Sequence, residues 1–178
     1  MNSATPLLFS LKPHYADLVF AGLKQAELRR RIIPFMENRD VYVYVSSPIR
    51  CLRGGFRVGH VWRGSPDEIW NQVSDLASID KRDFDAYYAG RTIAYALKIT
   101  DVWEHVYPTD LSTLKKRFSR FVVPQSWRYL RPEEYRSFRR MKRKIKEIQP
   151  ALVLETTSRS NGQMNNHFEY AANSLPQT

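Results

Sequence analysis

The segment Asp40–Ser47, DVYVYVSS, alternates valine and tyrosine with a period of two. β-branched and aromatic residues favour strands, and successive side chains of a strand point to opposite faces of the sheet. The three valines therefore share one face and the two tyrosines share the other. Because both faces are apolar, the segment fits a barrel or a sheet covered on both sides better than an open sheet.

Other segments extend this pattern into an α+β domain built around a curved or closed mixed sheet. Further strands are predicted over 7–11, 51–62 and 91–103, and helices begin near 13, 65 and 80 and span 111–118 and 132–148. The glycines of the 51–62 strand indicate a bulge, a bend or a close backbone approach. The organisation expected is one β-barrel domain over 1–131, a basic C-terminal helix over 132–149 and a mostly disordered tail over 150–178.

The net charge is +10, and it is concentrated in one region. Residues 110–150 hold thirteen Lys or Arg against four Asp or Glu, so the rest of the chain is close to neutral. Such a balance predicts an anionic partner, with nucleic acid the first choice and an anionic membrane surface the second. Within the predicted helix, Arg139, Arg140, Lys142 and Arg143 are the candidates for gripping a phosphate backbone, the alternative being the solvated face of a packed helix.

Composition also indicates a compartment. The apolar runs are too short to span a bilayer, and the N-terminus has no basic region before an apolar core, as a secretory signal would. The single cysteine, Cys51, cannot form an internal disulfide, so a reducing, cytoplasmic setting is expected. Cys51 is expected in the core rather than as a nucleophile.

The segment Gly22–Arg31, GLKQAELRRR, places a Lys, a Glu and three Arg on a short predicted strand. Alternation puts Glu27, Arg29 and Arg31 on one side, where a rigid element would hold them as a recognition or catalytic edge. Arg30 falls on the apolar side, which indicates a buried or pocket-facing guanidinium. The alternative is an ordinary solvated strand whose charges pair with one another.

These residues carry a resemblance to a known family. A short strand is followed by Lys12-Pro13, a helix and G-x-K-x-x-E-x-R over 22–29; then come a strand ending Ser46-Ser47-Pro48, a glycine-containing strand and Tyr87-Tyr88-Ala89-Gly90 before another strand. The order resembles the ASCH superfamily, whose fold is a PUA-like β-barrel, near the predicted transcriptional regulators with a PUA-like domain. The resemblance covers roughly residues 6 to 130.

The resemblance implies a cleft beside the first helix that binds RNA or a modified nucleoside. Carried over by position, Lys24, Glu27 and Arg29 would line this cleft, with Lys12 and Ser46 or Ser47 near its rim. One branch of the superfamily is an amidohydrolase acting on acetylated cytidine through a Lys, a Thr and a Glu. Its Lys matches Lys24, but its Thr falls at Glu27, so the nucleophile of that reaction is missing.

Another relative within the superfamily is a ribonuclease, which keeps acid–base catalysis open. Glu27 would then act as the base and Lys24 would stabilise developing negative charge. The alternative for this pair is a structural ion pair. Trp127, set among Arg120, Arg128 and Arg131, and Tyr129 are the best candidates for stacking on bases, while most other aromatics are expected in the core.

No metal and no cofactor is expected, because the histidines and the cysteine show no metal-ligand spacing. The first hypothesis is a nucleic-acid-binding protein, RNA rather than DNA, with a nucleotide-sized cleft. The second is a hydrolase acting on a modified nucleoside or RNA. The third is a DNA-binding transcriptional regulator, which requires the basic helix to enter a groove. No membrane partner is expected, and the sequence does not indicate an oligomeric state.

Overall fold

The computed structural model describes residues 4–145. The elements follow in the order β1 (Leu7–Leu11), α1 (Pro13–Phe20), β2 (Ala26–Arg29), β3 (Asp40–Val45), β4 (Cys51–Gly64), α2 (Pro66–Ala77), α3 (Lys81–Tyr88), β5 (Ala94–Asp110), α4 (Leu111–Arg117), β6 (Trp127–Tyr129), α5 (Pro132–Phe138) and β7 (Arg143–Ile145). Most of the elements lie where the sequence predicts them. Strands β6 and β7 are additions, because the sequence analysis assigns no strand to 127–129 and places 143–145 in a helix.

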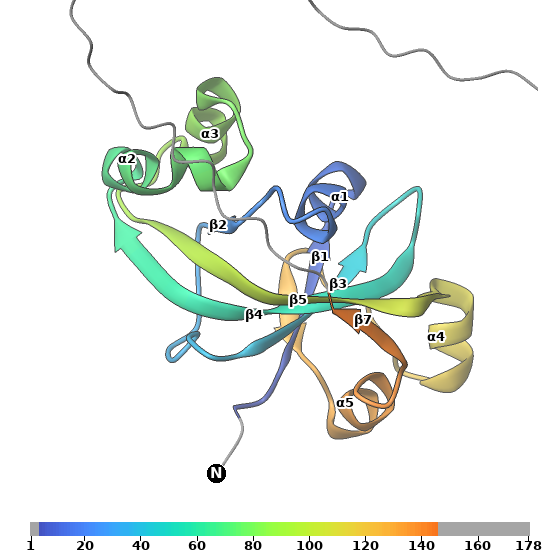
Figure 1. The fold of residues 1–178 in the computed structure, drawn as a ribbon. Helices are drawn as coiled ribbons and strands as arrows, with labels where there is room; N and C mark the ends of the chain where they lie inside the picture. The colour runs from blue at the N-terminus through green and yellow to red at the C-terminus, as the bar shows by residue number, and fades with distance from the viewer. Residues whose placement is uncertain (1–3, 146–178) are drawn as a thin grey trace, which may run out of the picture.

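The seven strands of residues 4–145 form one curved sheet in the order β2-β5-β4-β3-β1-β6, with β7 also paired to β5 (Figure 1). Strands β1 and β3 run parallel, and the other pairs are antiparallel. The long strands β4 and β5 run along the length of the molecule and connect its two ends. The predicted α+β class with a mixed, barrel-like sheet is confirmed.

Strand β3 buries both of its faces, as its alternation predicts. Its valines pack with Phe9 and Phe56 inside the curve of the sheet. Its tyrosines pack on the outer face with Trp103 and Phe138. The sheet is therefore covered by an apolar layer on each face, and β3 contributes side chains to both layers.

Helices cover the two ends of the long strands (Figure 1). Helices α2 and α3 pack against β2 and β5 through a third apolar cluster that includes Leu28, Ile69 and Phe84. Helix α4 follows the far end of β5, and α5 lies nearby on that side of the sheet. The molecule thus has one end built from α2 and α3 and another built from α4 and α5.

Local sequence signals fix several helix ends. Gly22 has a φ of +76° directly after the last turn of α1, a conformation that glycine adopts without a Cβ penalty. Ser65 and Glu68 form a capping box at the start of α2. Asp110 accepts from the backbone of Thr113 and caps α4. These signals act within a few residues, which is why the sequence predicts them.

Glycine in β4 permits a close approach between β4 and β5, as predicted. A Cβ on Gly54 would lie 2.2 Å from the carbonyl oxygen of Trp103, and one on Gly55 would lie 2.5 Å from the Trp103 ring. The register of β4 shifts on both sides at this point. Any larger residue would push β5 away and open the sheet.

The continuous basic helix predicted over 132–148 is wrong for residues 139–145. Helix α5 ends at Phe138, and Arg143–Ile145 form β7, which pairs with Trp103–His105 of β5. Strand β2 leaves this part of the β5 edge unpaired, so β7 satisfies its backbone groups. Residues 146–149 of the predicted helix, and the tail predicted over 150–178, lie outside the described residues.

Among the described residues, no helix is long and apolar enough to cross a membrane.

Candidate functional site

A cavity of about 800 Å³ opens where the two ends of the curved sheet approach each other. Its volume lies within the range of about 300–1,000 Å³ that is usual for small-ligand sites. Four parts of the chain form its walls: the junction of β1 and α1, strand β2 with the residues after it, helix α3, and the segment that enters β6.

Arg29 closes the seam between the two edge strands. Strands β2 and β6 stand at opposite ends of the strand order, so no backbone pairing joins them. Arg29 donates from Nη1 to the hydroxyl of Ser126, 2.9 Å away, just before β6. Its guanidinium also lies 3.9 Å from the centre of the Phe9 ring on β1. The guanidinium of Arg29 is therefore held in the cavity lining by contacts to both sides of the opening.

The three charges predicted on this segment converge and are buried. Lys24, Glu27 and Arg29 are 3%, 6% and 5% exposed. Arg29 Nη2 lies 2.9 Å from Glu27 Oε1, and Lys24 Nζ lies 3.9 Å from Glu27 Oε2. All three line the cavity. This burial excludes the alternative of a solvated strand whose charges pair on the surface, because the side chains of a surface ion pair are exposed to solvent.

Lys24 also has a structural contact. Its Nζ donates to the carbonyl oxygen of Ala77, 2.6 Å away, at the end of α2. Helix ends favour cations, because their last carbonyl groups lack partners. Burial lowers the pKa of the Lys24 ammonium, Glu27 opposes this shift, and Arg29 adds to it. Lys24 therefore fixes α2 to the cavity and is a stronger acid than an ordinary lysine.

Arg29 keeps unused hydrogen-bonding capacity. Within the described residues, its Nε and Nη2 make no hydrogen bond of good geometry, although Nη2 is close to Glu27. Buried donors without partners are costly, and a guanidinium presents its donors in a planar fork that suits carboxylates and phosphates. Both atoms are enclosed by protein, so a ligand in the cavity would reach them only if neighbouring side chains moved.

The walls of the cavity combine aromatic rings with positive charge. Trp127 and Tyr15 line it, and Arg30 lies 4.4 Å from the centre of the Tyr87 ring. Arg30 is exposed, so it faces the cavity from its rim and is not buried. Two of the lining residues are acidic, Glu27 and Asp83, whereas six are cationic: Lys12, Lys24, Arg29, Arg30, Arg31 and Arg91. The cavity therefore suits an anion that carries a flat group.

Several predicted site residues lie elsewhere. Lys12 lines the cavity, whereas Ser46 and Ser47, predicted with it near the rim, do not. Arg139, Arg140 and Lys142 are exposed near α5, away from the cavity lining. Arg143 is half-buried, and its guanidinium lies 4.6 Å from the centre of the Trp103 ring and donates to the Tyr42 hydroxyl.

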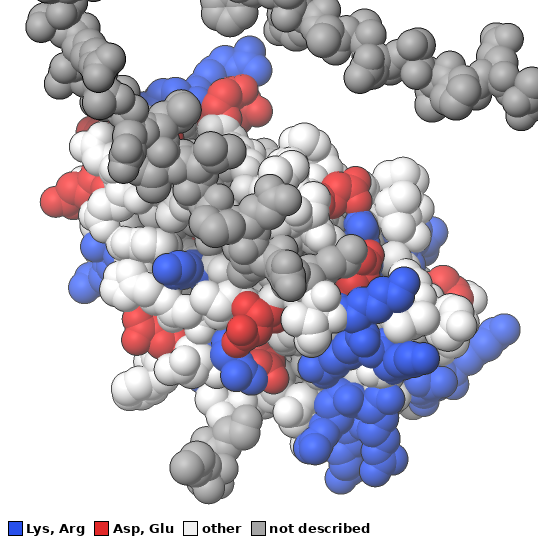
Figure 2. Space-filling view, viewed as in Figure 1, with Lys and Arg blue, Asp and Glu red and all other residues white. Residues whose placement is uncertain are grey.

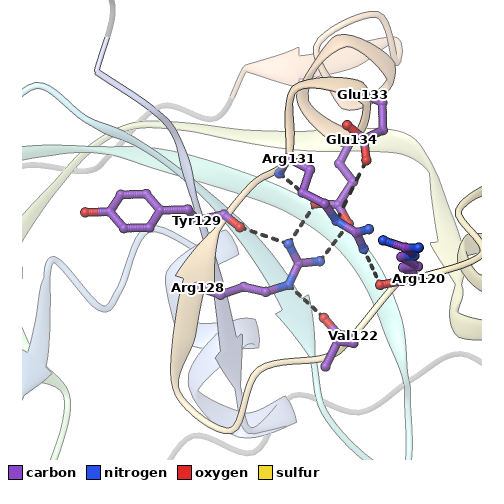
Figure 3. Close-up of polar contacts among 7 residues, drawn as sticks. All are labelled: Arg120, Val122, Arg128, Tyr129, Arg131, Glu133 and Glu134. Carbon is purple, nitrogen blue, oxygen red and sulfur yellow. Dashed lines mark hydrogen bonds and ion pairs between the residues drawn. The ribbon is translucent and has the colours of Figure 1, made fainter.

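Arg128 belongs to a polar network centred on Glu134 (Figure 3). Its two Nη atoms donate to the two Glu134 oxygens at 2.7 and 2.9 Å, and its Nε donates to the carbonyl of Val122. The backbone N–H of Arg131 also donates to Glu134, which is fully buried. The donors of Arg128 are used within the protein, so the geometry gives it a structural role and not a ligand contact.

Helix α3 and the segment before β6 supply cavity residues that sequence reasoning missed. Asp83, Tyr87 and Arg91 come from α3 or its end, and Ser126 precedes β6. The sequence does contain a signal for the Tyr87-Tyr88 pair, since this pair forms part of the family resemblance. The sequence does not show that the two side chains point toward β2. Tyr87 and Tyr88 donate to the backbone carbonyls of Leu28 and Arg29 at 3.3 and 3.4 Å.

No group of three or more His, Cys, Asp or Glu side chains that could hold a metal ion occurs among residues 4–145. Cys51 is buried, and burial raises the pKa of its thiol, as expected of a core residue.

Comparison with known proteins gives consistent findings. A family model described as the ASCH domain matches residues 9–156. An ASCH domain-containing ribonuclease from Zymomonas mobilis is 28% identical over 128 residues, which cover 71% of this chain and 85% of that protein. The ribosomal protein uL22 of Ureaplasma parvum is 29% identical over 125 residues, 70% of this chain but 39% of that protein. The chain therefore spans about two fifths of the uL22 relatives that it matches.

Solved structures agree with the sequence comparison. The crystal structure of ASCH from Zymomonas mobilis superposes with a TM-score of 0.69 at 26% identity, covering 74% of this chain and 92% of that one. A mutant of the same protein gives a TM-score of 0.70 at 25% identity and covers 77% of this chain and 96% of that one.

Proposed function

Because this chain belongs to the ASCH domain family, we propose that it binds single-stranded RNA and takes one nucleotide into the cavity at the seam of the sheet. The observation that carries the proposal is the buried cluster of Lys24, Glu27 and Arg29, which lines the cavity. A phosphate group would accept from the cationic side chains that line the cavity, Arg29 and Arg30 among them. The aromatic walls would contact the base, since RNA-binding proteins commonly stack unpaired bases on aromatic side chains.

The relatives support RNA as the ligand. One is named as an ASCH domain-containing ribonuclease, an enzyme class that acts on RNA, and the match covers 85% of it. Another is named as a protein of the large ribosomal subunit, of which the match covers 39%. Single-stranded RNA suits the site better than a duplex, because the aromatic groups lie inside a cavity that a paired base cannot enter.

Direct binding tests the proposal. We expect a short single-stranded RNA to bind the parent protein and to bind Arg29→Lys at least about tenfold more weakly, because a lysine cannot reproduce the planar fork. Circular dichroism of the variant checks that the fold is retained. Equal affinity of a folded Arg29→Lys variant and the parent would contradict a phosphate contact at Arg29.

A second candidate function is RNA cleavage in the same cavity, and the position of Glu27 between Lys24 and Arg29 favours it. Glu27 would take the proton of a ribose 2′-hydroxyl, whose oxygen attacks the adjacent phosphorus and forms a cyclic phosphate. The bond to the 5′ oxygen then breaks, and that oxygen takes a proton from the Lys24 ammonium. Arg29 would stabilise the charge on the phosphoryl oxygens.

Glu27→Gln separates cleavage from binding. The amide keeps the shape of the carboxylate but cannot serve as a base, so the candidate function predicts that cleavage stops while RNA remains bound. Cleavage is measured as RNA ends carrying cyclic phosphate. Cleavage at the parental rate by Glu27→Gln would rule out this role. The acetylcytidine amidohydrolase alternative lacks its Thr nucleophile here, since Glu27 occupies that position.

The DNA-binding alternative loses its structural basis. It requires the basic segment to enter a groove as a helix, and α5 ends at Phe138, before most of the basic residues. Helix α5 has seven residues, which corresponds to only about two turns.

A further inference from the structure

A second surface of the protein carries most of its uncompensated charge. Within residues 111–145, nine Lys or Arg are exposed: Lys115, Lys116, Arg117, Arg120, Arg136, Arg139, Arg140, Lys142 and Lys144. We call these residues the basic face. Figure 2 shows Lys and Arg gathered on the side where α4, α5 and β7 lie in Figure 1. Within 111–145, Glu133 is the one exposed carboxylate, because Glu134 is buried.

The charges of the basic face have no internal counter-charges. Among the described residues, none of its nine members forms an ion pair with a carboxylate. The two glutamates of α5 pair instead with Arg128 and Arg131. Like charges this dense repel one another and destabilise the folded state unless an anion binds. The face is therefore suited to a polyanion.

A hollow within the basic face gives it a defined geometry. The hollow has a volume of about 470 Å³ and lies between the end of α4 and the outer side of α5. Three guanidinium groups line it, from Arg117, Arg136 and Arg140, together with Ser137, Met141 and Glu133. Arg117 donates to the Ser137 hydroxyl at 3.2 Å, which holds its guanidinium beside those of α5.

The basic face and the cavity are joined by a short, rigid segment. Trp127 lines the cavity, and α5 begins at Pro132, so their Cα atoms lie at most about 18 Å apart. The buried Glu134 network fixes the intervening residues, since Arg128 and Arg131 both donate to this carboxylate (Figure 3). The segment therefore ties the cavity wall to the start of α5, and an RNA strand long enough to pass along it would contact both the cavity and the basic face.

We propose that the basic face is a second RNA site, which binds the phosphates of the strand outside the cavity, with Arg117, Arg136 and Arg140 as its centre. This inference rests on the proposed function, because it assigns the cavity and the basic face to one RNA strand. The two sites have different tasks. The cavity selects a nucleotide, whereas the basic face adds affinity that does not depend on base sequence.

The test compares two double charge reversals that change the net charge equally. Arg136→Glu with Arg140→Glu alters the hollow, and Arg63→Glu with Lys98→Glu alters two exposed cations on β4 and β5, outside the basic face. Affinity for a long single-stranded RNA and for a trinucleotide is measured across a range of salt concentrations.

We expect the hollow variant to bind the long RNA at least about tenfold more weakly, and its slope of log K against log salt to fall by about 1.4, since each phosphate contact contributes about 0.7. Trinucleotide affinity should not change, and the control variant should bind the long RNA almost as the parent does. Equal losses in both variants would overturn the proposal. Failure of the trinucleotide to bind the parent protein would instead count against the cavity, so the two failures are distinguishable.

A substitution of Glu133 provides a test in which the affinity for RNA should rise and not fall. Glu133→Gln removes the carboxylate at the hollow without removing a cation, so the long RNA should bind more tightly to this variant. Vesicles containing phosphatidylserine test the other anionic surface. If the hollow variant loses vesicle binding but keeps parental affinity for the long RNA, the face serves a membrane and the proposal is overturned.

Discussion

The Nη1 atom of Arg29 lies 2.9 Å from the hydroxyl oxygen of Ser126, and this hydrogen bond joins the two ends of the strand order across 97 residues of sequence. Because β2 and β6 share no backbone pairing, side chains hold the opening of the cavity in place. The same residue lines the cavity, where its guanidinium pairs with Glu27. One residue therefore closes the fold and forms part of the candidate site.

Ser126→Ala should weaken this closure. We expect the free energy of unfolding to fall by about 1–2 kcal/mol, because the hydroxyl is the acceptor of a buried, charged donor. Urea denaturation measures the change. Ser119→Ala is the matched control, since Ser119 is exposed and makes no hydrogen bond within residues 4–145. A loss in Ser126→Ala no larger than in the control would show that the bridge adds nothing to stability.

Glu134→Gln should be strongly destabilising. Glu134 is fully buried and accepts from both Nη atoms of Arg128, so the neutral amide leaves a partly buried guanidinium without its counter-charge. Breaking a buried ion pair in this way costs about 3–5 kcal/mol. Its exposed neighbour gives the control, because Glu133→Gln should change stability by no more than about 0.5 kcal/mol. Similar denaturation midpoints for the two variants would argue against the network.

Trp127→Ala should weaken RNA binding. Stacking of a base on an aromatic side chain contributes about 1–3 kcal/mol, so affinity should fall by about 5-fold to 150-fold. Trp127→Phe keeps an aromatic face and should retain most of the affinity. Fluorescence anisotropy with a short labelled RNA measures both. If Trp127→Ala and Trp127→Phe bind equally well, Trp127 does not stack on a base.

Acidification should destabilise the protein through His105. This residue is 2% exposed, and neither ring nitrogen has a hydrogen-bond partner within the described residues. Burial, with the nearby charge of Arg143, lowers its pKa from 6.5 to about 4. The unfolded chain therefore binds a proton that the folded chain excludes, so the free energy of unfolding falls as the pH falls from 6.5 toward 4.

His105→Phe isolates this contribution from the other titrating groups. The loss of stability between pH 6.5 and pH 4 should be smaller in the variant than in the parent, by up to about 3 kcal/mol. Urea denaturation at each pH gives the comparison. Parallel stability profiles for the two proteins would mean that His105 titrates alike in the folded and unfolded chains.

The predicted basic helix shows where sequence periodicity misleads. Tyr135, Phe138, Met141 and Ile145 recur at helical spacing, yet Ile145 is 76% exposed and lies in a strand. The free edge of β5 decides the outcome, because pairing with Trp103–His105 satisfies backbone groups that would otherwise lack partners. The periodicity of residues 132–148 contains no information about the unpaired edge of β5, which lies about 40 residues earlier in the chain.

Arg128 shows that a local cluster of charge in the sequence also predicts a residue's role poorly. Its sequence neighbours are basic and aromatic, which predicts a ligand contact, but the buried Glu134 takes its guanidinium. Arg29 has a different outcome, since it also pairs with a carboxylate, Glu27, but lines the cavity. Whether an arginine serves the fold or a ligand depends on which acceptors surround it in three dimensions.

The sequence by itself determined strands β1 to β5, most helix boundaries and the segment carrying Lys24, Glu27 and Arg29, because alternation, capping and glycine conformation act between residues a few positions apart. Only the tertiary structure decided that these charges are buried beside α3 and Ser126 and that the basic residues form a face, not a helix. The curvature of the sheet sets those distances, and it results from long-range pairing that no local pattern encodes.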